Sequence, residues 1–306
     1  MPTFLQCKQL GVSNIEEYFK KIDTKGFGGY GIVYKAEVTP EGKAMIGHDL
    51  PSHVAVKSIK LGPSIKSEML INEIDMLKHH QLPHGIKYYG CFENSSYLYI
   101  IMELIDGKDL FDYINDRVPV LTMDEKILIA REIALGINEF HDKGLIHRDI
   151  KPENVMVVLK PVLRVVIIDY GFICDMARPT SGCFKPAGTL GYHDVKEVKS
   201  IDKVKTYNSM KLSDWWSFGQ LLSMLLFDTY LYNQHTKKYS ILPADPRNTV
   251  PPVLYNVLFD LTDPNREQTE RPQEAVIISA LINASKQKHH KPLKVGIPQK
   301  MRRLSL

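Results

Sequence analysis

Residues 147–154 read His-Arg-Asp-Ile-Lys-Pro-Glu-Asn, and this run is the most specific chemical signal in the chain. It places a carboxylate, Asp149, a cation, Lys151, and an amide, Asn154, on one short stretch. A set of this kind at this spacing provides a base, a charge that neutralises phosphate and a metal ligand. The run therefore predicts a loop that handles a phosphoryl group.

A second metal-binding carboxylate is predicted downstream of this loop. Asp169-Tyr170-Gly171 follows the apolar stretch Val165 to Ile168, which has the composition of a buried strand. An isolated Asp before a glycine usually marks a turn. Because this one follows the 147–154 loop at a strand end, we interpret Asp169 as a ligand of the same metal.

Upstream lies a glycine-rich stretch, residues 26–33, Gly-Phe-Gly-Gly-Tyr-Gly-Ile-Val. Between two strands, residues without side chains let backbone N–H groups approach phosphate oxygens. A glycine-rich hairpin turn would explain the stretch equally well by itself. However, Val54-Ala55-Val56-Lys57 follows in the next predicted strand, and Lys57 is the kind of cation that clamps the α- and β-phosphates.

In this order the motifs resemble those of the eukaryotic protein kinase family, over residues 18–285. The resemblance implies an α+β, bilobal fold: a small antiparallel sheet with one helix, then a larger, mainly helical lobe around a common cleft. It implies an active enzyme that transfers the γ-phosphoryl group of ATP to serine or threonine hydroxyls of protein substrates. The cofactors implied are ATP and Mg²⁺, with Mn²⁺ as an alternative. Serine/threonine specificity rests on Lys151, two residues after Asp149.

The resemblance also assigns roles to the catalytic residues. Lys57 pairs with Glu73 of the predicted helix, with Glu68 as the alternative. Asp149 orients and deprotonates the substrate hydroxyl, and Lys151 contacts the γ-phosphate. Asn154 and Asp169 hold the magnesium ion.

The nucleotide site follows from the same resemblance, although ordinary core packing would explain its apolar members equally well. Met102 guards the rear pocket, backbone groups of Glu103 to Ile105 form the hydrogen-bonding edge, and Asp109 meets the ribose. The residues expected at the phosphates and around the adenine ring are Gly26, Phe27, Gly28, Gly29, Tyr30, Gly31, Val33 and Ala55, with Met156 below the ring.

The expected domain organisation is an N-terminal extension (1–17), a kinase domain (18–285) and a basic tail (286–306) that includes Ser305. Within the domain we expect an N-lobe at 18–102, a hinge at 103–108 and a C-lobe at 109–285. Hydrophobic patterns predict strands at 31–38, 54–59, 97–104 and 165–168, helices at 64–79, 123–141, 212–227 and 253–261, and a loop at 40–51.

Several positions depart from the family pattern. Tyr170 stands where the family has Phe, and Tyr88 occupies another position of the same apolar stack, so two hydroxyls need partners, in each other or in water. Lys25 replaces an apolar residue before the first glycine.

The substrate-docking segment also departs from the family. Gly188 to Tyr192 matches it, but Asp194-Val195-Lys196 follows in place of Ala-Pro-Glu. Arg271, the expected partner of that missing Glu, is predicted to take Asp194 or Glu197 or to remain a surface arginine.

Regulation and substrate preference stay open. Arg148 before Asp149 usually signals an activation loop ordered by phosphorylation, yet Lys185 holds the usual acceptor position and Thr180 and Ser181 are the nearest alternatives. Asp109 and Glu153 favour basic substrates, whereas Met224 stands where strongly basophilic relatives have an acid.

Bulk composition is that of a globular protein, with a formal net charge of +4 that gives no support to nucleic-acid binding. The 4 cysteines show no zinc-type or redox-type spacing, so we expect no disulfide framework and a reducing compartment. No secretion signal or membrane span is evident, which predicts a cytoplasmic or nuclear protein. The oligomeric state is not predicted.

Two rival functions fit parts of the sequence. A pseudokinase would keep the fold as a scaffold, but Lys57, Asp149, Asn154 and Asp169 are all retained. A small-molecule kinase shares the Asp and Asn spacing, but Lys151, Pro152 and the 188–192 segment resemble protein kinases more closely.

Overall fold

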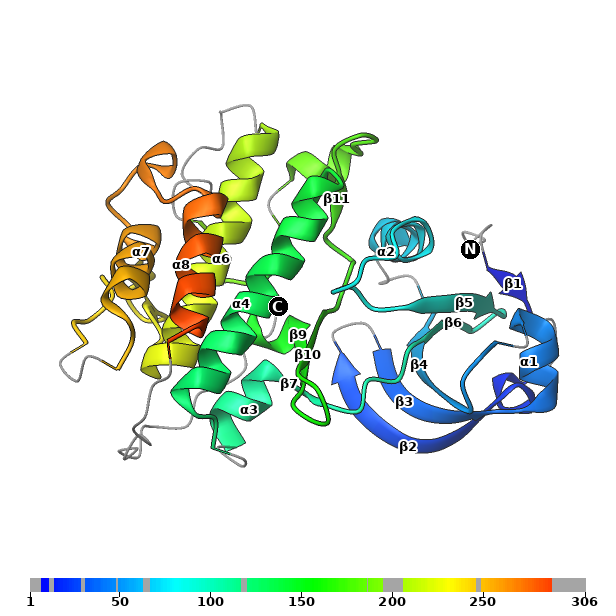
Figure 1. Ribbon diagram of the computed structural model, residues 1–306. Helices are drawn as coiled ribbons and strands as arrows, with labels where there is room; N and C mark the ends of the chain where they lie inside the picture. The colour runs from blue at the N-terminus through cyan, green and yellow to red at the C-terminus, as the bar shows by residue number, and fades with distance from the viewer. Residues whose placement is uncertain are drawn as a thin grey trace. The chain divides into compact units, whose positions relative to one another are not determined.

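The structure is a computed structural model of the 306-residue chain, and it divides into two compact units. The described residues are 7–10, 14–28, 31–47, 49–62, 67–116, 120–185, 187–194, 206–245 and 249–287. The first unit comprises residues 1–106 and 169–171, and the second comprises 107–168 and 172–306. The predicted α+β organisation is confirmed, with one sheet-rich unit and one mainly helical unit (Figure 1).

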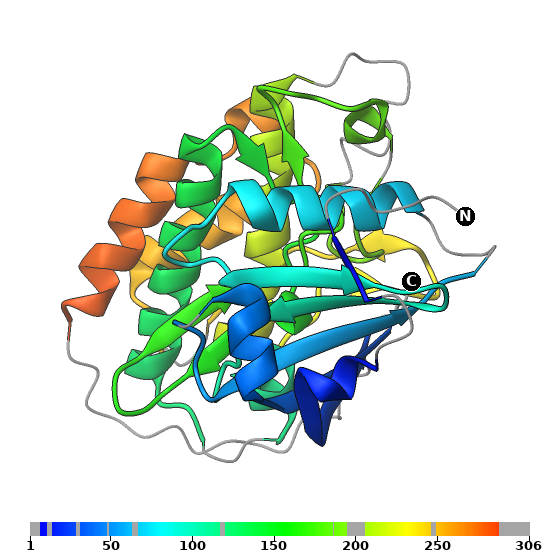
Figure 2. The same cartoon turned by 90° about the vertical axis from the view of Figure 1, so that its right-hand side faces the viewer.

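The first unit is built on a six-stranded sheet with strand order β1-β5-β6-β4-β3-β2. All neighbours are antiparallel except β1, which pairs in parallel with β5. Helix α2 lies beside the sheet (Figure 2). The elements are β1 (Lys8–Gln9), η1 (Ile15–Glu17), β2 (Phe19–Gly28), β3 (Gly31–Val38), α1 (Pro40–Ile46), β4 (His53–Lys60), α2 (Ser67–His79), β5 (Tyr88–Glu93) and β6 (Tyr97–Met102).

The sheet is curved around an apolar core. Alternating residues of β3 and β4 face the core, as expected for strands with one buried face. The buried members are Leu10, Ile15, Phe19, Tyr34, Ala36, Val38, Leu50, Val54, Val56, Phe92, Tyr99 and Ile101.

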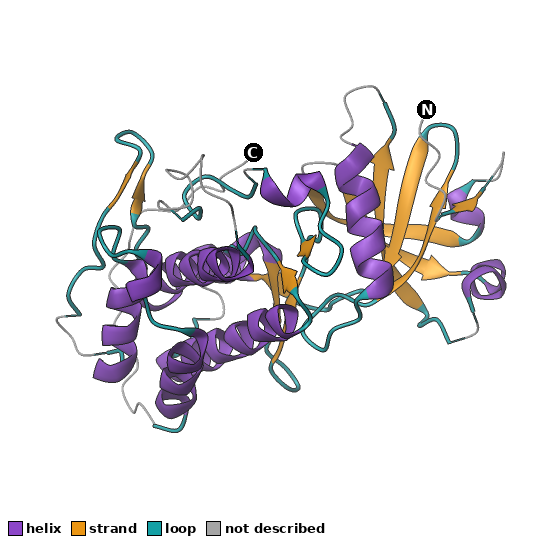
Figure 3. Cartoon of the chain, turned by 90° about the horizontal axis from the view of Figure 1, so that it is seen from above, coloured by secondary structure: helices purple, strands orange, loops and turns teal. Residues whose placement is uncertain are grey.

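The second unit is dominated by helices, with short strand pairs between them (Figure 3). Helix α4 begins with a capping box of Thr122 and Glu125, and α6 begins with one of Thr206 and Ser209. The elements are β7 (Lys108–Asp109), α3 (Leu110–Asp116), α4 (Met123–Asp142), β8 (Leu145–Ile146), η2 (Pro152–Asn154), β9 (Val155–Val158), β10 (Arg164–Ile167), β11 (Cys174–Asp175), η3 (Ser181–Phe184), α6 (Tyr207–Phe227), β12 (Tyr232–Asn233), β13 (Lys238–Tyr239), α7 (Pro252–Thr262), η4 (Gln268–Glu270) and α8 (Glu274–Ser285).

The loop predicted at 40–51 is wrong over its first half, because Pro40–Ile46 forms helix α1 as a second helix of the first unit. The Thr39 side chain accepts a hydrogen bond from the Gly42 amide, and Pro40 occupies the first helical turn. Proline is favoured at that position because its fixed φ suits a helix and the N–H it lacks would be unpaired anyway. The proline therefore begins the helix rather than breaking it.

The expectation of no disulfides is also wrong, because all four cysteines are paired. Cys7 joins Cys91 across 84 residues, and Cys174 joins Cys183 across 9 residues. The first disulfide fastens β1 to β5, so part of the predicted extension contributes a strand to the sheet. The cysteine content thus gives no support to a reducing compartment.

Candidate active site

The glycine-rich stretch forms the end of the β2–β3 hairpin, where Gly28 pairs with Gly31 and Gly26 with Val33. A Cβ atom on Gly31 would lie 2.2 Å from the Ser58 carbonyl oxygen of β4, so no larger residue fits there. Gly26 has open space instead, with nothing within 4 Å of a Cβ position. Gly29 and Tyr30 lie outside the described residues.

Sheet register gathers the predicted nucleotide residues of the first unit on one face. Val33 is opposite Lys57, and Ala55 is opposite Met102. Directly opposed residues, and residues two apart on one strand, share a face. Val33, Ala55, Lys57 and Met102 therefore form one surface, while the Glu103 amide at its end donates to the Lys87 carbonyl oxygen.

The predicted lysine pair is formed by Lys57 and Glu73, whose Nζ and Oε1 atoms lie 2.6 Å apart. Both side chains are nearly buried, while the alternative partner Glu68 is exposed. Burial raises the pKa of Glu73, and the nearby Lys57 ammonium opposes that effect. The ion pair fixes the Lys57 ammonium on the shared face, ready to meet an anion.

Asp169 belongs to the first unit, although more than 60 residues separate it from Asp106, where the main segment of that unit ends. Its backbone is left-handed, with φ of 68°, and its carboxylate accepts a hydrogen bond from the Gly171 amide. Asn72 of α2 donates to the Gly171 carbonyl oxygen. The carboxylate is thus positioned by its own turn and by α2.

Tyr170, which stands where the family has Phe, is buried beside Gly85. A Cβ on Gly85 would lie 2.2 Å from the Tyr170 hydroxyl oxygen, so the missing side chain makes the room that the extra hydroxyl needs. Burial raises the pKa of Tyr88 to about 12, which keeps its hydroxyl neutral. The predicted hydrogen bond between the Tyr170 and Tyr88 hydroxyls is not formed.

Replacing Gly85 by Ala is expected to lower the free energy of unfolding by about 1–3 kcal/mol, because it forces a clash in a packed interior. In a Tyr170→Phe background the same change should cost much less, since the clashing oxygen is gone. Urea unfolding of the four proteins in this cycle checks the result. An equal cost of Gly85→Ala in both backgrounds would contradict the proposed contact.

In the second unit the 147–154 loop is held by Asp214 of α6. The Asp214 carboxylate accepts hydrogen bonds from the His147 and Arg148 amides, each at 2.8 Å. Burial alone would raise the pKa of Asp214, but its hydrogen bond with His141, the charge of His147 and the Arg148 amide hold it below its ordinary value. The Asp214 carboxylate thus holds the backbone at the start of the loop.

Asp149, Lys151 and Asn154 meet in one buried network, as their spacing predicted. Asn154 Nδ2 donates to Asp149 Oδ2 at 2.9 Å, and Lys151 Nζ lies 3.0 Å from the same oxygen. Thr189 Oγ1 donates to Asp149 Oδ1 at 2.7 Å and accepts from Lys151 at 2.6 Å. Each carboxylate oxygen of Asp149 thus has a fixed partner.

Sequence reasoning missed the part that Thr189 plays. Its signal was available in the Gly188 to Tyr192 segment, which was interpreted only as a place for substrate docking. Thr189 is buried and joins that segment to the loop 40 residues earlier. Residues 188–192 and the loop that carries Asp149 are therefore held together by Thr189.

The predicted ribose and adenine residues of this unit lie side by side. Asp109 of β7 is directly opposite Met156 of β9. The Asp109 carboxylate accepts a hydrogen bond from the Asp112 amide at the start of α3. The absence of a side chain at Gly107 lets its backbone approach β9 closely, because a Cβ there would lie 2.3 Å from the Val157 carbonyl oxygen.

The donor atoms predicted for a metal fit magnesium. Asn154 and Asp169 provide oxygen atoms, the ligands that this hard cation prefers. No group of three or more His, Cys, Asp or Glu that could hold a metal occurs in the described part of the chain. An amide oxygen and a carboxylate oxygen suit Mg²⁺, which is commonly held by one or two carboxylates together with substrate phosphates.

Although Ala-Pro-Glu is missing, Arg271 still forms a buried ion pair, with Asp194 as its partner. Arg271 Nη1 lies 2.7 Å from Asp194 Oδ2, and neither side chain is exposed. The Arg271 guanidinium also stacks 4.3 Å from the Trp216 ring centroid. The Asp194 alternative is confirmed, while Glu197 lies outside the described residues.

Two other departures are local. Lys25 forms an exposed ion pair with Asp23 at 3.1 Å. Met224 is buried and accepts a hydrogen bond from the Tyr192 hydroxyl at its sulfur atom.

Comparisons with known proteins identify the family of this chain. The model of the protein kinase domain matches residues 19–288. Human myosin light chain kinase family member 4 is 32% identical over 67% of this chain and 49% of its own length. A calcium/calmodulin-dependent protein kinase of Metarhizium anisopliae is 32% identical over 69% of this chain and 52% of its own. A probable serine/threonine-protein kinase of Dictyostelium discoideum is 26% identical over 64% and 40%.

The chain spans about half the length of the first two of these relatives. A search of the described residues finds no helix with the length and apolar character needed to cross a membrane. The family match covers most of the 306 residues and contains every motif described above. The chain therefore belongs to the protein kinase domain family.

Proposed function

We propose that this chain is an active protein serine/threonine kinase that transfers the γ-phosphoryl group of Mg-ATP to hydroxyls of protein substrates. The observation that carries the proposal is the buried Asp149 carboxylate, held by Asn154 and Thr189 beside the Lys151 ammonium. A base, a cation and a metal ligand fixed together are what phosphoryl transfer requires.

In the proposed reaction Asp149 accepts the proton of the substrate hydroxyl, whose oxygen then bonds to the γ-phosphorus as the bond to ADP breaks. Lys151 stabilises the negative charge on the transferred group, and its two hydrogen-bonding neighbours hold it in place. Lys57, fixed by Glu73, binds the α- and β-phosphates. Bound Mg²⁺, held by Asn154 and Asp169, would neutralise charge on the phosphate oxygens.

The nucleotide base and ribose are assigned to residues that share surfaces within each unit. Val33, Ala55 and Met102 offer an apolar face to adenine, with the backbone of Glu103 to Ile105 at its edge. Met156 and the neighbouring Asp109 would contact the other side of adenine and the ribose. The hinge and lobe boundaries given above, at 103–108 in particular, are part of this proposal.

The scaffold alternative is weaker because every group named in the reaction is present and most are held by specific partners. The small-molecule alternative is weaker because Thr189 links the protein-docking segment directly to Asp149. Specificity for serine and threonine rests on Lys151, whose ammonium lies at the base itself.

The test is incorporation of labelled γ-phosphate into myelin basic protein and into the chain itself, with ATP and Mg²⁺. We expect wild type to incorporate phosphate and Asp169→Ala to lose at least 99% of that activity, because the metal loses its carboxylate ligand. A wild type that shows a nucleotide-dependent thermal shift but no incorporation would contradict the proposal and favour the scaffold role.

A further inference from the structure

The segment that follows Gly171 is attached to the catalytic loop by backbone pairing. Cys174 of β11 is opposite Ile146 of β8, and Ile146 is followed directly by His147, Arg148 and Asp149. Only His147 and Arg148 thus separate this pairing from the proposed base. Any change in the position of β11 is therefore passed to the loop that carries Asp149.

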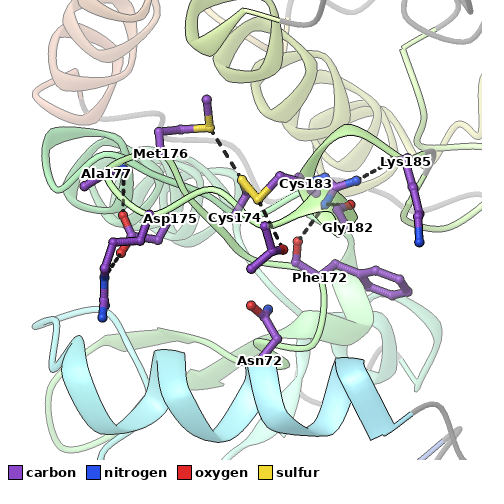
Figure 4. Close-up of a disulfide and its surroundings, with 12 residues drawn as sticks. Asn72, Phe172, Cys174, Asp175, Met176, Ala177, Gly182, Cys183 and Lys185 are labelled. Carbon is purple, nitrogen blue, oxygen red and sulfur yellow. Dashed lines mark hydrogen bonds and ion pairs between the residues drawn. A yellow bond between two sulfur atoms is a disulfide. The ribbon is translucent and has the colours of Figure 1, made fainter.

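The Cys174–Cys183 disulfide ties β11 to the short helix η3, as Figure 4 shows. Both cysteines are buried in a small apolar cluster with Ile146 and Met210. Between them the turn is exposed over residues 177–180, with few apolar side chains to hold it. The disulfide is thus a covalent link between η3 and β11.

Arg148 completes the attachment by donating to backbone carbonyl oxygens on both sides of the disulfide. Its acceptors are Phe172 at 3.4 Å, Gly182 at 3.1 Å and Lys185. In the family an arginine here usually pairs with a phosphorylated residue, whereas here Lys185 holds that position and accepts a hydrogen bond from Arg148 at its carbonyl oxygen. The carbonyl oxygens supply the acceptors that a phosphate would otherwise provide.

We propose that Cys174 and Cys183 form a reversible thiol–disulfide switch that takes the place of activation-loop phosphorylation. In the disulfide form the segment from Phe172 to Lys185 is ordered and the catalytic loop is competent. In the dithiol form the segment is released, because the loop regains the conformational entropy that the cross-link removed. The effect on activity rests on the kinase function proposed above, and the effect on order does not.

The switching step is an exchange with a small dithiol. A thiolate of the dithiol attacks Cys183, whose neighbours Phe184 and Lys185 are exposed, and the S–S bond breaks with Cys174 as the leaving thiolate. The second thiol of the dithiol then displaces Cys183. The dithiol is oxidised to its cyclic disulfide, and the two cysteines take up two protons and two electrons as thiols.

The experiment uses the full chain in three forms: wild type, Cys7→Ser/Cys91→Ser and Cys174→Ser/Cys183→Ser. The second form keeps only the proposed switch, and the third keeps only the sheet disulfide. Each is measured with and without dithiothreitol for thiol content by alkylation and mass spectrometry, for hydrogen exchange of residues 174–185, and for phosphate incorporation into myelin basic protein.

In wild type and in Cys7→Ser/Cys91→Ser, reduction is expected to speed exchange of residues 174–185 at least tenfold and to lower phosphate incorporation at least fivefold. Reoxidation with oxidised glutathione should restore both. Cys174→Ser/Cys183→Ser should exchange rapidly, have low activity and ignore dithiothreitol.

Unchanged exchange and activity in fully reduced Cys7→Ser/Cys91→Ser would overturn the switch, even if the third form does not fold. Faster exchange on reduction with unchanged activity would also overturn it, because the segment would then be tethered without consequence. Faster exchange with no phosphate incorporation in either state would overturn the proposed kinase function and still support redox control of the segment.

Discussion

Asp149→Asn is expected to incorporate phosphate into a protein substrate about a thousandfold more slowly than wild type, with its fold and nucleotide binding intact. The amide has the size of the carboxylate and offers one oxygen to the donors that surround it, Asn154 and Thr189. It cannot accept the proton of the substrate hydroxyl. The loss therefore falls on the turnover number rather than on binding.

The matched control for this prediction is Asp142→Asn. Asp142 is an exposed carboxylate of the same unit, whose interaction with Asn138 involves no residue of the proposed site. It should retain full activity. Thermal unfolding with and without ATP would show that both variants fold and bind nucleotide. Wild-type activity in Asp149→Asn would mean that Asp149 is not the base.

Asp194→Ala is expected to lower the free energy of unfolding by about 3–5 kcal/mol, because it leaves the fully buried Arg271 guanidinium without its counter-ion. The melting temperature should fall by about 6–10 °C. Urea unfolding and calorimetry would measure both quantities. This is the largest stability effect that we expect from a single substitution.

Two comparison variants isolate the cause of that loss. Asp194→Ala/Arg271→Met, which removes both charges and keeps an apolar chain on Trp216, should recover part of the stability. Asp260→Ala removes an ion pair with Arg266 whose side chains are 39% and 33% exposed, and it should cost less than about 1 kcal/mol. Equal losses in Asp194→Ala and Asp260→Ala would contradict a special role for the buried pair.

Much of the candidate site followed from the sequence because its groups are close in the chain or lie in regular elements. Asp149, Lys151 and Asn154 lie within five positions of one another in the chain, so their meeting could be predicted without knowledge of the fold. The choice of Glu73 over Glu68 came from the resemblance, because Glu73 and Ile74 followed by Leu77 match the helix pattern of the family. Helix α4 matched its predicted range to one residue.

The sequence by itself thus determined the family and the order of the main elements, since these depend on local spacing and hydrophobic period, and it predicted the residues of the phosphate chemistry. Only the tertiary structure decided which distant groups meet: Cys7 with Cys91, Thr189 with Asp149, and Asp194 with Arg271. These pairs are 84, 40 and 77 residues apart. Over such separations local preference has no influence, and packing of the whole unit sets which side chains come into contact.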